Sequence, residues 1–407
     1  MESAVSTRTR RAAMTALFAS AGLSSTGYIA AIIVAPLIAE DLLGSATLSG
    51  LPSAVTVIGM AIGSMMLSTR MAKRGRRSGL ILGYAVVAVA AVLAVVATNL
   101  ASFSLFSIAM FALGTGHSAN RLTRYAAADL YEPARRASAI GWIIWAGTIG
   151  SIAGPALLEP ARIIATWFGT AETSGAYLVT VAGALSAVGV LCAKMPLLAS
   201  SNASIATAAR PAGLRRLLVM PDIQIALVAL VISQGVMVLL MTMTPVHIRS
   251  AGNGLGSIGL VIGAHAFGMY ATSPLTGMLS DRLGRVPVIL IGMAMLIGAA
   301  FVAGNTPGHA TARLTVALLL LGFGWNFGFI AGSALLTDSV PDVDRIRVQG
   351  VVDSITWIAG AAASLGSGVL LAHGGFPVLS FVGAAFATLP ALMIGRHRLH
   401  QPRIASR

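Results

Sequence analysis

Several ionisable side chains stand inside long apolar stretches of this sequence, where a charge is costly and therefore suggests a task. His117, Arg121 and Arg124 share one face at helical spacing, and this arginine pair is a candidate to receive an anionic group. The alternative is that both arginines extend to the cytoplasmic membrane surface. His265 lies deep in another apolar stretch and is a candidate for proton coupling, because histidine changes charge near neutral pH. A neutral histidine bonded between helices is the alternative.

The elements that position these residues are long apolar helices. Hydrophobic residues make up 56% of the chain and charged residues 10%, against about 25% in soluble proteins. The composition predicts an all-α membrane protein with twelve transmembrane helices. We place these spans near 12–38, 48–69, 78–98, 102–128, 138–158, 174–193, 222–247, 255–280, 286–304, 314–337, 349–372 and 376–394, each long enough to cross a bilayer. The first is too long for a cleaved signal peptide.

The basic residues predict how these spans are oriented. With twelve spans both termini lie on one side, and 24 of the 27 Lys and Arg residues fall on that side, counting Arg121 and Arg124 with the loop after span 4. The positive-inside rule makes that side cytoplasmic. The net charge of +14 therefore follows membrane topology and does not indicate nucleic-acid binding. The polar stretch 195–221 is read as a cytoplasmic linker between an N-terminal bundle, 1–194, and a C-terminal bundle, 222–407.

A charged motif interrupts the apolar pattern after span 8. Its residues, in the stretch GMLSDRLGR, are Gly277, Asp281, Arg282, Gly284 and Arg285. A degenerate copy follows span 2, where Gly75 and Arg76 remain at an offset of 209 but Ala72 replaces the Asp. A glycine permits a tight turn, and Asp281 is suited to point at the positive end of another helix. The bland alternative is membrane anchoring by positive charge alone.

The motif and the half-chain repeat resemble the major facilitator superfamily of transporters. A second pattern in span 5, formed by Gly141, Gly150, Gly154 and Pro155, resembles the antiporter motif of drug-efflux members. Generic packing of small residues is the alternative. Drug antiporters also carry an arginine in span 4, and the corresponding position here is Met110.

The resemblance implies two pseudo-symmetric six-helix bundles and alternating access. It also implies that spans 1, 4, 7 and 10 line a central cavity, with packing roles as the alternative for each residue taken singly. The substrate-binding candidates are then Tyr28, His117, Arg121, Arg124, Gln234, Trp325 and Asn326.

Asp353 is a carboxylate that falls inside a span, about one turn after the start of span 11. In the resembled family, the Asp of the first motif docks at the beginning of span 11. Because that Asp is Ala72 here, we expect a lock of reversed sign, in which a base from 70–77 reaches Asp353. The alternatives are that Asp353 complements the dipole of its own helix or lines the cavity.

We therefore predict a secondary active transporter that exports a small organic molecule by proton antiport. Uptake or facilitated diffusion of a metabolite is the alternative. We found no nucleophile–base pair, no metal-ligand spacing and no phosphate-binding loop, so we expect no enzyme, metal or cofactor. The expected partners are the substrate, the lipid bilayer and protons. The expected state is a monomer in the bacterial cytoplasmic membrane, with both termini cytoplasmic.

Overall fold

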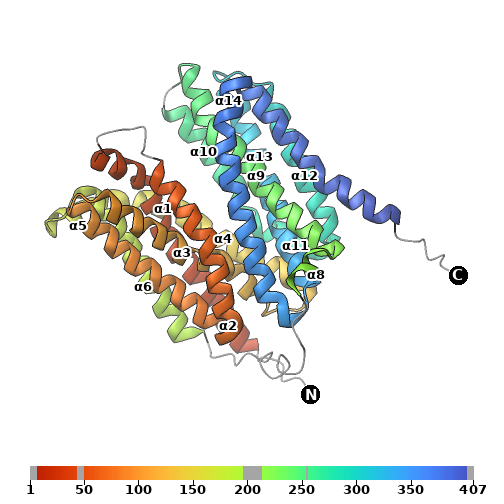
Figure 1. Ribbon diagram of the computed structural model, residues 1–407, viewed down its shortest axis with the longest axis horizontal. Coiled ribbons are helices and arrows are strands. Elements are labelled where there is room, and N and C mark those ends of the chain that lie inside the picture. The colour runs from red at the N-terminus through yellow and green to blue at the C-terminus, as the bar shows by residue number, and fades with distance from the viewer. Residues whose placement is uncertain (1–6, 44–49, 196–212, 254, 401–407) are drawn as a thin grey trace. The chain divides into compact units, whose positions relative to one another are not determined.

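The computed structural model describes residues 7–43, 50–195, 213–253 and 255–400, and these ranges are helical apart from short turns (Figure 1). The first half contributes α1 Thr7–Leu43, α2 Leu51–Asn99, α3 Phe103–Ala128, α4 Arg136–Ala156, α5 Leu158–Trp167 and α6 Gly175–Lys194. The second half contributes α8 Leu214–Leu218, α9 Pro221–Ser250, α10 Leu255–Tyr270, α11 Ser273–Leu283, α12 Arg285–Gly304, α13 Thr311–Ser339 and α14 Asp342–His400. Most of the predicted linker, 196–212, lies outside the described ranges.

Within the described residues, all twelve predicted spans are helical over most of their length, although the helices divide them differently. Among the described residues, eight helices are long and apolar enough to cross a membrane, or nine if the bent pair α10–α11 is one span. Two of them, α2 and α14, each carry two predicted spans on either side of a glycine with non-helical dihedral angles. The span predicted as 255–280 is broken by a 40° bend. Pro274 stands at the start of α11, where it cannot donate a helical hydrogen bond.

The two motif glycines adopt nearly the same backbone conformation. Gly75 has φ 81° and ψ 159°, and Gly284 has φ 90° and ψ 164°. Residues with a Cβ are strained at such positive φ values, so glycine is needed for the chain to reverse between consecutive helices. The predicted tight turns are therefore present within both motif copies.

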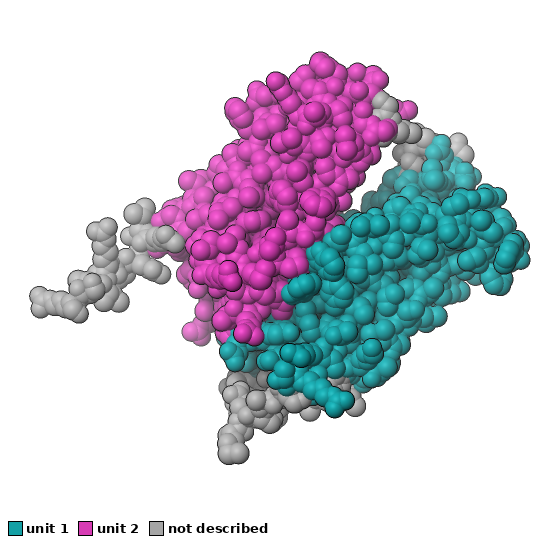
Figure 2. Space-filling model, turned by 180° about the vertical axis from the view of Figure 1, so that it is seen from behind, with its two compact units in different colours: residues 1–132, 142–211, 341–358 teal, residues 133–141, 212–340, 359–407 magenta. Residues whose placement is uncertain are grey.

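The described chain divides into two compact units, coloured separately in Figure 2. Unit 1 comprises residues 1–132, 142–211 and 341–358, and unit 2 comprises residues 133–141, 212–340 and 359–407. Each unit thus includes one short segment from the other half of the sequence. The start of α14 belongs to unit 1, and the start of α4 belongs to unit 2.

Small residues allow the helices inside each unit to approach closely. In unit 1, a Cβ added at Gly63 of α2 or at Gly114 of α3 would collide with the backbone of the facing helix. In unit 2, Gly322 of α13 packs in the same way against the backbone oxygen of His265 on α10. Close packing of this kind is typical of membrane helices, where van der Waals contact drives association. It fixes α3 and α13, the helices that carry most of the polar candidates.

Candidate functional site

The C-terminal part of α3 carries a buried ion pair. Ser102 caps the start of the helix by accepting a hydrogen bond from Leu105 N at 3.3 Å. Further along, the Arg124 guanidinium bonds Oδ1 of Asp353 on α14 at 2.7 Å, and their side chains are 2% and 0% exposed. Both residues belong to unit 1. Arg124 is therefore buried inside unit 1, contrary to the alternative in which both arginines extend to the membrane surface.

Further hydrogen bonds hold both members of this pair. Arg124 also donates to Tyr125 Oη at 3.0 Å and to the backbone oxygen of Arg121 at 2.8 Å. The Ser64 hydroxyl of α2 donates to Oδ2 of Asp353 at 2.7 Å. Because each carboxylate oxygen has a donor, the buried charge is both neutralised and hydrogen-bonded, as burial requires.

Aromatic rings accompany the other polar residues of α3. The Arg121 guanidinium lies 4.7 Å from the ring centre of Trp357, one turn beyond Asp353 on α14. The His117 ring stacks on Tyr28 of α1, with ring centres 3.7 Å apart and planes 12° from parallel. The structure thus brings together the substrate-binding candidates of unit 1, in two adjoining groups along α3.

The expected partner of Asp353 was wrong. Its basic partner is Arg124 of α3 and not a residue of the turn 70–77. Arg76 of that turn instead donates to Gln349 at 2.5 Å, one turn before Asp353 on α14, and pairs with Asp129 at 2.8 Å. Because α14 begins at Asp342, Asp353 lies about three turns into the helix and is nearer to another span than to a surface turn, which explains the difference.

The candidates of unit 2 form a neutral polar and aromatic group. Trp325 of α13 donates from Nε1 to Gln234 Oε1 of α9 at 3.1 Å and stacks on Phe329. The next residue, Asn326, is fully buried and donates to the backbone oxygen of Met269 and to the Ser273 hydroxyl, at 2.5 and 2.6 Å. Within the described residues, Gln234 and Trp325 contact each other, whereas Asn326 ties α13 to the bent region of α10–α11.

His265 is buried between α10 and α13. Its Nδ1 lies 3.0 Å from the backbone oxygen of Leu318, while no hydrogen bond to Nε2 is found among the described residues. This geometry corresponds to the alternative of a histidine bonded between helices, and it leaves one ring nitrogen without a protein partner in that part of the chain.

The intact motif of unit 2 anchors the first turn of α4. Asp281 accepts hydrogen bonds from Ala137 N at 3.2 Å and from Ser138 N and Oγ at 2.8 and 2.5 Å. Arg285 pairs with Asp281 at 2.6 Å and with Asp338 at 3.0 Å. The expected contact of Asp281 with the positive end of a helix is present, and Arg282 is exposed beside it.

Sequence reasoning missed a second set of charges that completes both motif copies. In unit 2, Asp338 joins Arg285 to Arg136, with an Arg136–Asp338 distance of 2.8 Å. In unit 1, Asp129 joins Arg76 to Arg345 at 2.8 and 3.8 Å. The three residues of unit 1 and the three of unit 2 correspond pairwise at the offset of 209 already found for Arg76 and Arg285: Asp129 corresponds to Asp338, and Arg136 to Arg345. Extending that offset to charged residues outside the motif would have found them.

The glycines of the span 5 pattern lie on the packed face of α4. A Cβ at Gly150 would meet Ser25 and Thr26 of α1, and one at Gly154 would meet Thr26 and Ile29. Pro155 comes next, near the helix end. The pattern therefore brings α4 and α1 into close backbone contact within unit 1.

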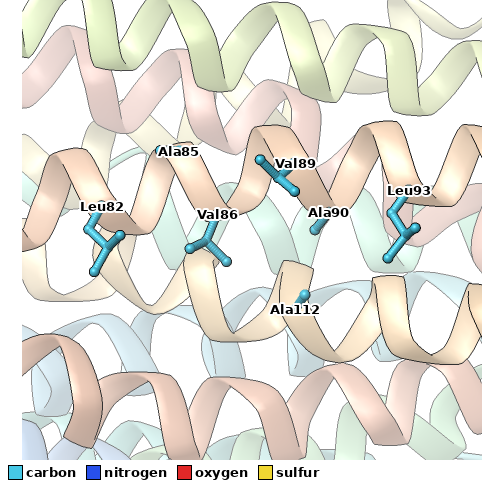
Figure 3. Close-up of a pocket in the computed structure, with 7 residues that line it drawn as sticks. All are labelled: Leu82, Ala85, Val86, Val89, Ala90, Leu93 and Ala112. Atoms are coloured by element: carbon cyan, nitrogen blue, oxygen red, sulfur yellow. The ribbon is translucent and has the colours of Figure 1, made fainter.

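A hollow on unit 1 between α2 and α3 has a purely apolar lining (Figure 3). It is lined by Leu82, Ala85, Val86, Val89, Ala90, Leu93 and Ala112. Val89 is 69% exposed, which is typical of a lipid-facing position rather than of a solute site. With no polar group to orient a solute, this hollow does not fit a specific substrate site.

Comparisons with known proteins agree with this architecture. The family model described as "Major Facilitator Superfamily" matches residues 17–256 and 225–406. The MFS-type transporter YdeG of Bacillus subtilis (strain 168) is 34% identical over 393 residues, 94% of this chain and 90% of that protein. The riboflavin transporter RfnT of Brucella anthropi is 30% identical over 349 residues, 85% of each chain.

Among solved structures, the E. coli fucose:proton symporter FucP has a TM-score of 0.72 at 16% identity. The alignment covers 95% of this chain and 98% of that one. The match of the family model to both halves corresponds to the internal repeat found in the sequence. The chain is an integral membrane protein and belongs to the major facilitator superfamily of transporters.

Proposed function

We propose that this transporter exports a small organic molecule in exchange for protons, through alternating access between the two halves of the chain. The observation that carries the proposal is the set of buried polar side chains on α3 and α13, led by the Arg124–Asp353 pair. Ionisable residues inside membrane spans are expensive and mark substrate or proton pathways. The residues proposed to contact substrate remain Tyr28, His117, Arg121, Arg124, Gln234, Trp325 and Asn326.

The direction of transport rests on α4. The spacing of Gly141, Gly150, Gly154 and Pro155 resembles that of drug antiporters, and Gly150 and Gly154 form a close helix contact. Rigid, closely packed helices suit a bundle that moves as one body. The motif residues, with Asp281 and Arg285 in one copy and Arg76 in the other, would stabilise one conformation of the cycle through their ion pairs.

Uptake or facilitated diffusion of a metabolite is the second candidate. The position of the span 4 arginine of drug antiporters is here Met110, which is buried and whose sulfur lies 3.4 Å from Tyr177 Oη. The relative RfnT is named for riboflavin. Riboflavin is therefore a suitable first solute to test.

We further propose a monomer in a bacterial cytoplasmic membrane, with both termini and the 195–221 linker cytoplasmic. On a background with the exposed Cys192 replaced by Ser, cysteines at Arg216 and Asn253 would be probed with an impermeant thiol reagent on intact cells. Labelling of Asn253→Cys and protection of Arg216→Cys is expected. The reverse pattern would overturn the orientation.

Flux into proteoliposomes tests the mode of transport. Riboflavin and a panel of small organic solutes would be measured with and without an imposed pH gradient. Antiport predicts that an outwardly directed proton gradient drives solute flux in the opposite direction. Flux that ignores the gradient would support facilitated diffusion instead.

The same assay tests proton coupling at His265. If His265 carries the coupling proton, His265→Ala should abolish gradient-driven flux but keep solute exchange. Unchanged dependence on the gradient would remove His265 from the coupling mechanism.

A further inference from the structure

The pair of Arg124 and Asp353 is held unequally by its surroundings. Arg124 donates to Tyr125 Oη and to the Arg121 backbone oxygen in addition to Asp353. Both of these acceptors lie on α3, the helix that carries Arg124 itself. Asp353 lies on α14, and within the described chain its side chain is bonded by Arg124 and Ser64. The guanidinium therefore keeps its position when the carboxylate leaves, and it presents a fixed cation to whatever anion takes its place.

The Arg124 guanidinium already binds a carboxylate, that of Asp353. We therefore expect a substrate that binds Arg124 to present a carboxylate as well. The planar guanidinium fork matches carboxylate and phosphate groups, and the group that it holds here is a carboxylate. A buried ion pair is a poor device for stability alone, because apolar residues of similar volume often serve as well. Burial of the Arg124–Asp353 pair is explained if a substrate can replace Asp353 as the partner of Arg124.

We infer that an organic carboxylate replaces Asp353 on Arg124 during transport, and that Asp353 takes up a proton when it leaves. This rests on the second candidate for the transport function, uptake, because a proton that binds together with the substrate moves in the same direction; it names the substrate class. One proton binds to the Asp353 carboxylate, the Arg124–Asp353 contact breaks, and the substrate carboxylate forms the new contact with Arg124. The charges of Arg124, Asp353 and the substrate sum to zero before and after the exchange, so the exchange adds no net charge to the apolar interior.

The groups that face Asp353 suit this exchange. From α3 they are Arg124 and, through Arg124, Tyr125, with the second cation Arg121 nearby at Trp357. From α2 the facing group is the neutral hydroxyl of Ser64, which can accept as well as donate and so can bond the protonated acid. On α14 itself Gln349, one turn earlier, holds Arg76. Among the described residues of this cluster, Asp353 is the one acidic side chain.

Trp357 adds a requirement for the body of the substrate. Its ring lies against Arg121, one helical turn from Asp353, so an aromatic group attached to the carboxylate would have a flat apolar surface within reach. Benzoate is the simplest probe with these features. Benzamide has the same shape without the charge and is the matched control.

Ligand binding to the purified full-length protein in detergent tests the inference. Benzoate and benzamide would be titrated at several values between about pH 5.5 and 7.5, where benzoate stays ionised, with tryptophan fluorescence and thermal unfolding as readouts. Benzoate should bind and benzamide should not. The affinity for benzoate should fall by up to about tenfold per pH unit as the pH rises, because each binding event takes up one proton.

Four variants separate the parts of the exchange. Arg124→Gln should lose benzoate binding, and Arg124→Gln with Asp353→Asn should lose it too without leaving a buried charge alone. Asp353→Asn should bind benzoate with an affinity that no longer depends on pH. Arg162→Gln, which breaks an exposed arginine–carboxylate contact elsewhere in unit 1, should match the unchanged protein. Equal binding by the double variant, or unchanged pH dependence in Asp353→Asn, would overturn the proposal.

Proton uptake gives a second readout on the unaltered protein, in case a variant does not fold. Adding benzoate in weak buffer near pH 6.5 should take up about one proton per anion bound. No binding of benzoate, or binding without proton uptake, would exclude the exchange. If riboflavin or another solute still shows gradient-driven flux, the transport function stands and only the carboxylate site is refuted.

Discussion

The two motif turns share a charged framework but differ in the group that anchors a helix start. Each has an arginine bonded to an aspartate that also holds a second arginine: Arg76, Asp129 and Arg345 in unit 1, and Arg285, Asp338 and Arg136 in unit 2. In unit 2 the anchor is Asp281, which accepts from backbone N–H groups of α4. In unit 1 Ala72 cannot do this.

In unit 1 the hydrogen-bond donors and acceptors of the corresponding contacts are exchanged between the helices. The acceptors now lie on α14, as Gln349 and Asp353, and the donors lie on the facing helices, as Arg76 and Arg124. The position in α4 that corresponds to Asp353 at the offset of 209 is the apolar Ile144. The lock predicted from Ala72, in which a base of 70–77 reaches Asp353, is not formed, because Asp353 is paired with Arg124 of α3. Loss of a motif residue therefore need not mean loss of the connection that it makes.

The largest expected effect is at the buried pair. Arg124→Gln should lower the free energy of unfolding by about 3–5 kcal/mol, because it leaves the Asp353 charge buried without a counter-ion. Adding Asp353→Asn should recover part of that loss by removing the stranded charge. Thermal and denaturant unfolding in detergent measure both effects. If the double variant is no more stable than Arg124→Gln, the two charges are not coupled.

Asp281 should show the next largest effect. Asp281→Ala removes the acceptor for Ala137 N and Ser138 N and the partner of Arg285, and should cost about 2–3 kcal/mol, since hydrogen bonds to a charged group are strong. Exposed Arg282→Gln is the control from the same motif and should leave stability unchanged.

The reciprocal change sharpens the comparison of the two turns. Ala72→Asp would restore the family residue in unit 1, but α14 is already held there by Gln349 and Asp353. We expect no gain comparable to the loss in Asp281→Ala. A gain of equal size would show that the contacts of unit 1 do not substitute for the missing aspartate.

Packing around the anchors differs in the same way. In unit 2 a Cβ at Gly141 would meet the backbone oxygen of Ser273, whereas in unit 1 a Cβ at the equivalent Gly350 would first meet the side chain of Ser68 and, less closely, the backbone oxygen of Ser64. Gly350→Ala should cost about 1–2 kcal/mol by overpacking, and Ser68→Gly should restore part of it. Gly141→Ala should cost more, because backbone cannot move aside as a side chain can. Unfolding measurements on the four variants test this, and a failed rescue by Ser68→Gly would mean that Ser68 is not the obstacle.

The fold could be predicted from the sequence because several independent patterns agreed. Long apolar stretches, the placement of basic residues and the half-chain repeat all indicated twelve membrane helices, and the two motif glycines have the turn conformation expected of them. The broken span at Pro274 was missed, because the hydropathy of 255–280 is continuous across the bend. Apolar content reports a membrane environment and does not report helix continuity.

The pairing of individual side chains was less predictable. Arg124 and Asp353 are separated by 229 positions, and each was predicted as a functional candidate inside a span without being joined to the other. Helical periodicity gives the face on which a residue lies, but not which residue of another helix is opposite. The offset of 209 contains that information for Asp129 and Asp338, because repeated halves repeat their contacts. It contains none for Arg124 and Asp353, whose pair exists in one unit.

An exposed pair on α5 supplies the smallest expected effect and tests whether burial, rather than pairing, separates these clusters. Glu159 and Arg162 are 2.7 Å apart, with side chains 68% and 43% exposed, and Arg162 also reaches Glu172. The hydrogen bond from Arg162 lowers the pKa of Glu159 below its usual value. A lowered pKa in the folded state means that any stabilisation is present above the unfolded pKa and disappears as the pH falls through the folded one.

Because water and salt screen this pair, Glu159→Gln should leave the unfolding temperature near pH 7 unchanged. The same measurement repeated down to about pH 3.5 should show no difference between Glu159→Gln and the unaltered protein beyond that of two repeats, as expected for an exposed pair. Raising the salt concentration should likewise have no effect on their difference. If Glu159→Gln instead destabilises the protein as strongly as Asp281→Ala, an arginine–carboxylate contact matters wherever it occurs. The contrast drawn between the anchors of units 1 and 2 would then lose its basis in burial and helix ends.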